Sequence, residues 1–276
     1  MAKLDVTDLF PWNKMEKRTV NGISMVFCPN IYVKTEVIPA GSDYAGKMAY
    51  MISEKPQDGF HIHPAFVKNG EVAGEGILWG TDILDLNAVS YNDLVTKAAS
   101  HGSGFEPYNI YDHHMIARLM LIEAGSADIQ TILGGADGKM GYTWHGINNV
   151  WGGTSTGFWF YGLTTEGGTI HILSNKMDGT MIDTGISCSG KSGWIKECMT
   201  DKGANYDLSD VFLAKSVDGT EANGTFGDYS NLGNGGYAFY SYYSSSSTGF
   251  GPMYLSHHSL TYKSSWLGLR LRKVAA

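Results

Sequence analysis

The sequence has little cysteine, and the cysteines it has are poorly placed for cross-links or metal binding. Only Cys28, Cys188 and Cys198 occur in 276 residues. They are far apart and odd in number, so they form neither a CxxC pair nor a disulfide framework. We therefore expect a chain that is made and folded in a reducing cytoplasm. Cys28 lies in a strand-like segment, which predicts a buried, small apolar residue rather than a nucleophile.

Long hydrophobic runs and basic clusters are also missing. No stretch approaches the roughly 20 apolar residues of a membrane helix, and residues 1–10 lack the apolar core of a secretory signal. The net charge is −7, and no basic run exceeds a few residues. We therefore expect no membrane insertion and no nucleic-acid partner.

The residues that are abundant favour turns and ordered loops over a helical bundle. The chain contains 36 Gly, 16 Tyr and 7 Trp, and 43% of its residues are hydrophobic. Glycine supplies the backbone conformations that tight turns need. The length and the apolar content are sufficient for one large domain or two small ones.

Two segments have the spacing and the end signals of helices. The first begins near Ser90, with Asp93 three residues on, and stops at Gly102. The second begins near Asn109 or Asp112 and stops at Gly125. Short apolar segments bounded by turn residues predict strands at 23–27, 31–34, 48–52, 59–66, 76–79 and 169–173.

Residues 229–265 have an unusual composition. They hold seven of the 16 tyrosines, many Ser, Asn, Gly and His residues, and Lys263 as the one charged residue. Tyrosine offers a large rigid contact area and Ser, Gly and Asn offer adaptable hydrogen bonding, as in antibody combining loops. A disordered linker would have few aromatics and more charge. Ordered binding loops are the favoured interpretation, and aromatic structural loops without a ligand are the alternative.

Several motifs, taken in order, resemble one known family. The chain is similar to the formylglycine-generating-enzyme branch of the C-type lectin fold, and more narrowly to phage tail-tip ligand proteins and retroelement-diversified variable proteins. The usual Gly-Phe-Arg-Leu ending has Leu269 in place of the aromatic residue. The motifs lie at 59–66, 115–130, 146–152, 235–237, 249–251 and 267–271.

The resemblance implies an α+β fold of the C-type lectin type, with two helices on small antiparallel sheets and long ordered loops. Residues 22–276 would form one domain, and 1–21 a lead-in or attachment segment. The segment just before the closing strand would be the ligand-binding face. Its candidate contacts are Tyr229, Asn231, Asn234, Tyr237, Phe239, Tyr240, Tyr242, Tyr243, Ser245, Tyr254, Ser256, His257, His258 and Tyr262.

The family resemblance also predicts which aromatic residues belong to this face and which belong to a buried framework. At least half of the segment's tyrosines should be exposed, because alternation along a strand sends neighbouring side chains to opposite faces. Tryptophans in a Gly-rich fold with small sheets more often fill the core, and Trp151 is placed there. The framework should also bury Phe250, Trp266, Leu267 and Leu269.

Catalytic and metal sites are not evident in the sequence. Enzymes of the resembled branch use a close pair of cysteines near the C-terminal end, and no cysteine follows Cys198. We therefore expect no catalytic residue and no cofactor. His61 and His63 share a strand face, but further metal ligands are not evident, and the motif makes His63 structural. The pair 113–114, at a helix start, is expected to be solvated or capping.

The histidines and acidic residues of the C-terminal segment also fall short of a metal site. His257 and His258 are adjacent on a strand, so they should point to opposite faces and cannot share a metal. A calcium site would need clustered oxygen ligands. The weak candidates for one are Asp228, Asn231 and Asn234, for which turn roles are favoured.

The sequence therefore predicts a non-enzymatic receptor- or ligand-binding protein. The leading hypothesis is a phage tail-tip adhesin in the virion, attached through its N-terminus, that binds a host cell-surface protein or glycan. The second is a cellular, retroelement-diversified binding protein, cytoplasmic or at the cell surface. The third is an enzyme on the same fold that acts on a surface glycan.

Overall fold

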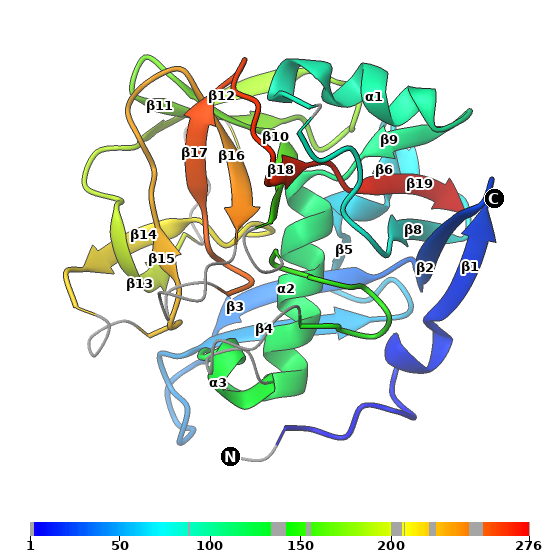
Figure 1. The fold of residues 1–276 in the computed structure, drawn as a ribbon. Helices are drawn as coiled ribbons and strands as arrows, with labels where there is room; N and C mark the ends of the chain where they lie inside the picture. Colours follow the sequence, from blue (N-terminus) through cyan, green and yellow to red (C-terminus); the bar gives the residue numbers. More distant parts are fainter. Residues whose placement is uncertain are drawn as a thin grey trace.

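One helix, α2 (Ile110–Ala124), lies at the centre of the molecule, and small sheets are arranged around it (Figure 1). The computed structural model describes residues 3–87, 89–133, 142–152, 156–199, 206, 208–220, 225–242 and 251–275. Strands account for 40% of the structure and helices for 15%. The sheets form a propeller-like ring of four blades. The prediction of an α+β C-type lectin fold, with two helices packed on sheets, is therefore wrong.

Helix α2 is buried on nearly every side, and its two ends are fixed by local hydrogen bonds. The Asn109 side chain accepts from the backbone N–H groups of Tyr111 and Asp112, at 2.9 and 3.0 Å. Asp112 in turn accepts from the N–H of Asn109, which completes a capping box. The helix ends at Gly125, whose φ of 60° is the left-handed conformation that glycine tolerates best. Both predicted boundaries are confirmed.

Two sheets are large. The first is antiparallel, and its C-terminal strand lies between two strands from the first half of the chain. Its order is β1 (Glu16–Val20), β2 (Ile23–Pro29), β8 (Gly76–Gly80), β19 (Leu271–Ala275) and β9 (Phe105–Pro107). The second runs β12 (Met181–Ser187), β11 (Thr169–Leu173), β10 (Gly157–Glu166), β16 (Tyr237–Tyr242) and β17 (Ser256–Ser259), with β18 (Leu267–Gly268) parallel to β10.

The remaining sheets are short, as expected for a Gly-rich chain with many turns. One consists of β14 (Ala214–Asp218), β13 (Gly193–Cys198) and β15 (Tyr229–Ser230). Another consists of β4 (Met48–Ser53), β3 (Tyr32–Val37) and β5 (His61–Ile62). A hairpin of β6 (Val67–Lys68) and β7 (Glu71–Val72) completes the set, with 3₁₀ turns η1 (Trp12–Lys14) and η2 (Pro64–Phe66) and helix α3 (Ile129–Leu133) between strands.

The first predicted helix is present in two parts. Ser90 and Asp93 form a capping box ahead of the 3₁₀ turn η3 (Tyr91–Asp93). Helix α1 (Leu94–Ser100) follows directly, and the chain turns at Gly102, whose φ is 135°. The start and stop signals are therefore confirmed.

The N-terminal segment contributes to the fold. Strand β1 pairs with β2 from Glu16 to Val20. Val6 and Trp12 are buried, with 4% and 6% of their surface exposed, and both belong to the main apolar core. Val6, Trp12 and strand β1 of the predicted lead-in segment are thus part of the fold, whereas the attachment role of the segment stays a prediction.

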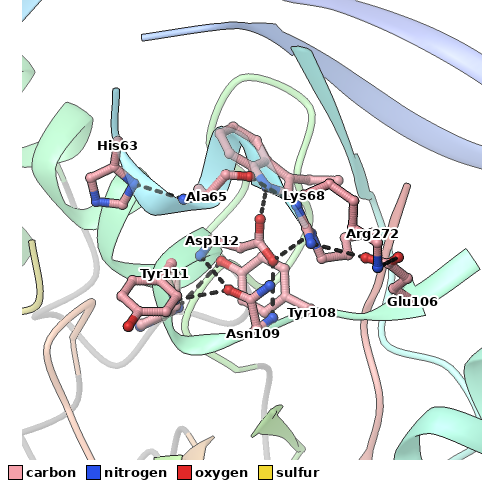
Figure 2. Close-up of polar contacts among 11 residues, drawn as sticks. His63, Ala65, Lys68, Glu106, Tyr108, Asn109, Tyr111, Asp112 and Arg272 are labelled. Carbon is pink, nitrogen blue, oxygen red and sulfur yellow. Dashed lines mark hydrogen bonds and ion pairs between the residues drawn. The ribbon is translucent and has the colours of Figure 1, made fainter. Parts of the chain in front are cut away.

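A buried ion network joins the C-terminal strand to the central helix (Figure 2). The Arg272 guanidinium lies 3.0 Å from both Asp112 Oδ2 and Glu106 Oε2, and it donates to the Ala65 carbonyl at 2.8 Å. Trp79 Nε1 donates to the other oxygen of Asp112 at 2.9 Å. Each buried carboxylate oxygen therefore has a partner, as buried charges require.

Of two predictions about residues that lie in the core, one is wrong and one is confirmed. His113 and His114 are 1% and 0% exposed, so the prediction that they are solvated is wrong. The helix start that suggested solvent lies in the centre of the molecule instead of at its surface. Cys28 is a free, buried cysteine, as predicted, and burial raises the pKa of its thiol well above the usual value. Within the described residues, no helix has the length and apolar character needed to cross a membrane.

Candidate ligand-binding surface

Strands β16 and β17 carry much of the predicted binding segment, and their pairing sorts its side chains onto two faces. Tyr237 pairs with Ser259 and Phe239 pairs with His257. Because directly opposite residues of an antiparallel pair share a face, these four side chains lie on one side of the sheet. Residues 238, 240, 256 and 258 lie on the other side.

The first face packs into the main core. Phe239 is completely buried, so its prediction as a ligand contact is wrong. His257 lies at the edge of this face, with its ring centroid 4.3 Å from that of Tyr237. Its Nδ1 is 2.9 Å from the Asn231 carbonyl oxygen. Tyr237 and His257 are both half-buried, and they form a pair at the border of the core.

The second face rests on a buried aromatic layer. Tyr240 is only 6% exposed, and its ring meets Trp159 edge-on at 5.6 Å. Burial raises the pKa of Tyr240 to about 12, although a hydrogen bond with Ser256 opposes this shift. Tyr240 and Ser256, which is 8% exposed, therefore support the face from below and offer a ligand almost no surface.

Four half-buried aromatic side chains lie together over this layer. They are Tyr242, His258, Tyr262 and Trp266, and we call them the aromatic surface. The His258 ring stacks on Tyr262 with 3.7 Å between centroids and 16° between planes. Trp266 lies 4.8 Å from Tyr242 and 6.2 Å from Tyr262. Such contacts hold the rings in fixed positions while part of each ring remains open.

The segment that carries Tyr262 and Trp266 is attached to the rest of the fold at three points. The Lys263 ammonium lies 2.8 Å from Asp93, next to α1. The Leu260 carbonyl accepts from the N–H of Asn92 at 3.2 Å, and the Trp266 carbonyl accepts from Gly157 at 2.7 Å. The aromatic surface is therefore part of an ordered framework rather than the end of a free loop.

His258 is held in its neutral form at this surface. Burial lowers the pKa of His258, and the neighbouring His257 lowers it further. A neutral imidazole stacks on an aromatic ring without the desolvation cost of a cation. At neutral pH the aromatic surface is therefore an uncharged patch with hydroxyl and ring N–H groups at its edges.

The other predicted contacts are not members of the aromatic surface, although Tyr254 hydrogen-bonds Ser256 beneath it. Tyr229 meets Trp194 edge-on at 5.8 Å in the sheet of β13. Asn234 is exposed, Asn231 and Tyr254 are half-buried, and Tyr243 and Ser245 lie outside the described residues. The prediction that at least half of the segment's tyrosines are exposed is wrong for the described residues, because Tyr240 is buried and the other described tyrosines are half-buried.

The predicted framework is confirmed in part. Leu267 and Leu269 are completely buried, and Trp151 is 2% exposed. Phe250 lies outside the described residues. The prediction that Trp266 is buried is wrong, because its ring is only half-buried between Tyr242 and Tyr262. Trp266 comes one residue before a buried strand, so the sequence suggested that it is buried as well. Only the alternation of side chains along a strand could have indicated that it points outward.

The calcium candidate Asp228 has a structural role. Its carboxylate is 1% exposed and accepts from the N–H of Met253 at 2.8 Å and from Gln130 at 2.9 Å. Burial raises the pKa of Asp228 well above its usual value. These contacts fix the chain just ahead of β17.

The histidines near β5 are likewise used within the fold. His61 Nε2 lies 2.7 Å from Asp210, while His63 is fully buried and caps η2 through the N–H of Ala65. His63 is thus structural, as predicted. In the part of the chain that the structure describes, no group of three or more His, Cys, Asp or Glu residues is arranged to hold a metal.

Compared with known proteins, the chain matches no protein-family model and no curated protein sequence. The geometry of the aromatic surface and the composition of its segment are therefore the basis for a functional assignment.

Proposed function

We propose that this protein is a non-enzymatic binding protein whose aromatic surface contacts a receptor or ligand on another molecule. The observation that carries the proposal is the clustering of Tyr242, His258, Tyr262 and Trp266 on one face of the β16–β17 hairpin. Contiguous apolar patches that remain open to solvent on a soluble protein can mark interaction sites. Tyrosine and tryptophan are also the residues that most often dominate binding energy at interfaces.

The rigidity of the cluster supports the same proposal. His258 is fixed between Tyr262 and Tyr240, whose centroids lie 3.7 and 5.8 Å from its own. Preordered side chains lose little conformational entropy when a ligand binds. On such a surface the aromatic rings provide contact area for a ligand, and the tyrosine hydroxyl groups provide directional hydrogen bonds.

The finer form of the proposal is a phage tail-tip adhesin that binds a host cell-surface protein or glycan. Its support is the motif resemblance and the Tyr/Ser-rich composition of 229–265. The segment 1–21 would then attach the protein to the virion, and the aromatic surface would face the host.

The test is binding of fluorescently labelled protein to a panel of bacterial cells and to a glycan array. Tyr242→Ala and Tyr262→Ala should each weaken binding by at least about 2 kcal/mol, or roughly thirtyfold. The matched control is Tyr44→Ala, because Tyr44 is 62% exposed in the loop between β3 and β4. Equal binding by all four proteins, or consistent turnover of a polysaccharide on the array, would count against this proposal.

A further inference from the structure

A small cavity of about 240 Å³ lies away from the aromatic surface. Two tight turns line it, one at Asn69 in the β6–β7 hairpin and one at Asp178 and Gly179 between β11 and β12. The N–H of Gly70 donates to the Lys176 carbonyl at 3.1 Å, which fixes the two turns to each other. The cavity is therefore bounded by ordered backbone from distant parts of the chain.

The lining carries balanced charge. Arg272, 1% exposed, lies 3.0 Å from Glu106, and Lys68 also pairs with Glu106 (Figure 2). With Asp178, the cavity holds two positive and two negative side chains. An anion would be repelled by two carboxylates, and a cation would be repelled by two positive groups. A neutral ligand avoids both repulsions. Carboxylate oxygens and an ammonium group that already form ion pairs still have hydrogen-bonding capacity for hydroxyl groups.

Tyr161 supplies an aromatic wall with a hydroxyl group. Its ring stacks on Tyr91 at 6.1 Å and 24°, which fixes its position. A Cβ atom at Gly179 would lie 3.9 Å from the Tyr161 hydroxyl, so that hydroxyl faces the turn at Asp178. Burial raises the pKa of Tyr161, and the Glu106 carboxylate adds to the shift, so the hydroxyl stays protonated as a donor. Val95 of α1, 53% exposed, adds apolar lining.

We propose that this cavity binds one neutral polyhydroxylated ring, such as a single sugar unit, beside Tyr161 and the turn at Asp178. A sugar ring has an apolar C–H face that suits the tyrosine and Val95. Its hydroxyl groups both donate and accept, which suits Lys68, Glu106 and Asn69. The volume is below the roughly 300–1,000 Å³ of pockets for drug-sized ligands, as one ring requires. The inference does not depend on the aromatic surface.

The test is a titration of the ¹⁵N-labelled full chain, followed by NMR, with four methyl glycosides. These probes are the α-glucoside, the α-mannoside, the β-galactoside and the N-acetyl-β-glucosaminide. A ligand of this size should have a dissociation constant on the order of 1 mM, so the titration runs to about 50 mM. We expect at least one glycoside to shift the backbone amide signals of Asn69, Gly70, Asp178 and Gly179.

Two conservative variants test the assigned contacts. Tyr161→Phe keeps the stacked ring and removes the hydroxyl, and it should weaken binding about fivefold. Asp178→Asn keeps the acceptor for the N–H of Thr180, 3.0 Å away, and removes the charge. It should weaken binding by about fivefold or more. Thermal unfolding of each variant checks that the fold is intact.

One control separates this site from others. Tyr44→Phe, in the exposed loop between β3 and β4, should leave glycoside binding unchanged. The inference is overturned if no glycoside shifts these amides, or if binding survives both Tyr161→Phe and Asp178→Asn. Inorganic phosphate or glycine, added as a separate probe, would refute the neutral ligand class by binding at these amides more tightly than every glycoside.

Discussion

The Arg272 Nε atom lies 3.0 Å from Asp112 Oδ2, so the C-terminal strand and the first turn of the central helix share a buried ion pair. Both side chains are almost completely buried, at 1% and 0% exposure. The same guanidinium also holds Glu106 beside the proposed cavity. One residue therefore joins the core of the fold to the lining of a candidate site.

Removing this arginine should destabilise the protein strongly. Arg272→Met leaves the buried Asp112 carboxylate without its cation, so we expect a loss of about 3–5 kcal/mol in the free energy of unfolding. Urea denaturation measures the change. The control is Glu36→Ala, which removes an exposed pair with Lys34 at 2.7 Å and should cost no more than about 1 kcal/mol. Equal losses of stability in the two variants would show that the buried ion pair stabilises the fold no more than the exposed one.

Glycine at position 251 should be required for the approach of the chain to Asp228. A Cβ atom there would lie 2.0 Å from Asp228 Oδ1, closer than any real contact. Gly251→Ala should therefore cost about 1–3 kcal/mol through overpacking. At Gly219 a Cβ atom would meet nothing within 4 Å, so Gly219→Ala should change stability by less than about 0.5 kcal/mol. Thermal unfolding of both variants compares them, and a harmless Gly251→Ala would contradict the packing.

Buried neutral histidines should make the fold sensitive to acid. Burial lowers the pKa of His63 to about 4 and that of His113 to about 3, and it lowers the pKa of His114 well below its usual value. The unfolded chain takes up these protons near pH 6.5, whereas the folded chain does not. Their contribution to stability is therefore complete above pH 6.5 and is lost as the pH falls toward the folded pKa values.

The slope of this loss can be measured at one residue. For each such histidine, the free energy of unfolding should fall by about 1.4 kcal/mol per pH unit as the pH is lowered from roughly 6 to 4.5. His63→Asn keeps an oxygen that can accept from the N–H of Ala65, so the variant should still fold. Its stability, measured by urea unfolding at several pH values, should fall less steeply than that of the natural chain by about this amount. Identical slopes would show that His63 is protonated in the folded state.

Trp266 and Leu269 should have opposite effects on binding and stability. Leu269 is completely buried, so Leu269→Ala should cost about 2–5 kcal/mol of stability through the cavity it leaves. Trp266 is half-buried against Tyr240 and Tyr242, so Trp266→Ala should cost less, about 1–2 kcal/mol. Trp266→Ala should abolish most ligand binding. Leu269→Ala should bind ligand normally when it is assayed at a temperature at which the variant is folded. The reverse ranking in either assay would remove Trp266 from the aromatic surface.

The sequence by itself determined the local features of the fold. The caps at Ser90 and Asn109, and the turn at Gly125, all lie where the pattern predicts them. Each depends on hydrogen bonds or backbone angles within a few residues, so the necessary information is adjacent in the chain. The placement of His257 and His258 on opposite faces also followed from the sequence, because the period of a strand is two residues.

Only the tertiary structure decided which of these elements are central and which face of a strand is open. The ring of small sheets surrounds α2, so His113 and His114 are buried although a helix start commonly meets solvent. Phe239 is buried because it packs into the main core, whereas Trp266 remains partly open beside Tyr242 and Tyr262. Burial is the sum of long-range contacts among segments far apart in sequence, and no local pattern contains that sum.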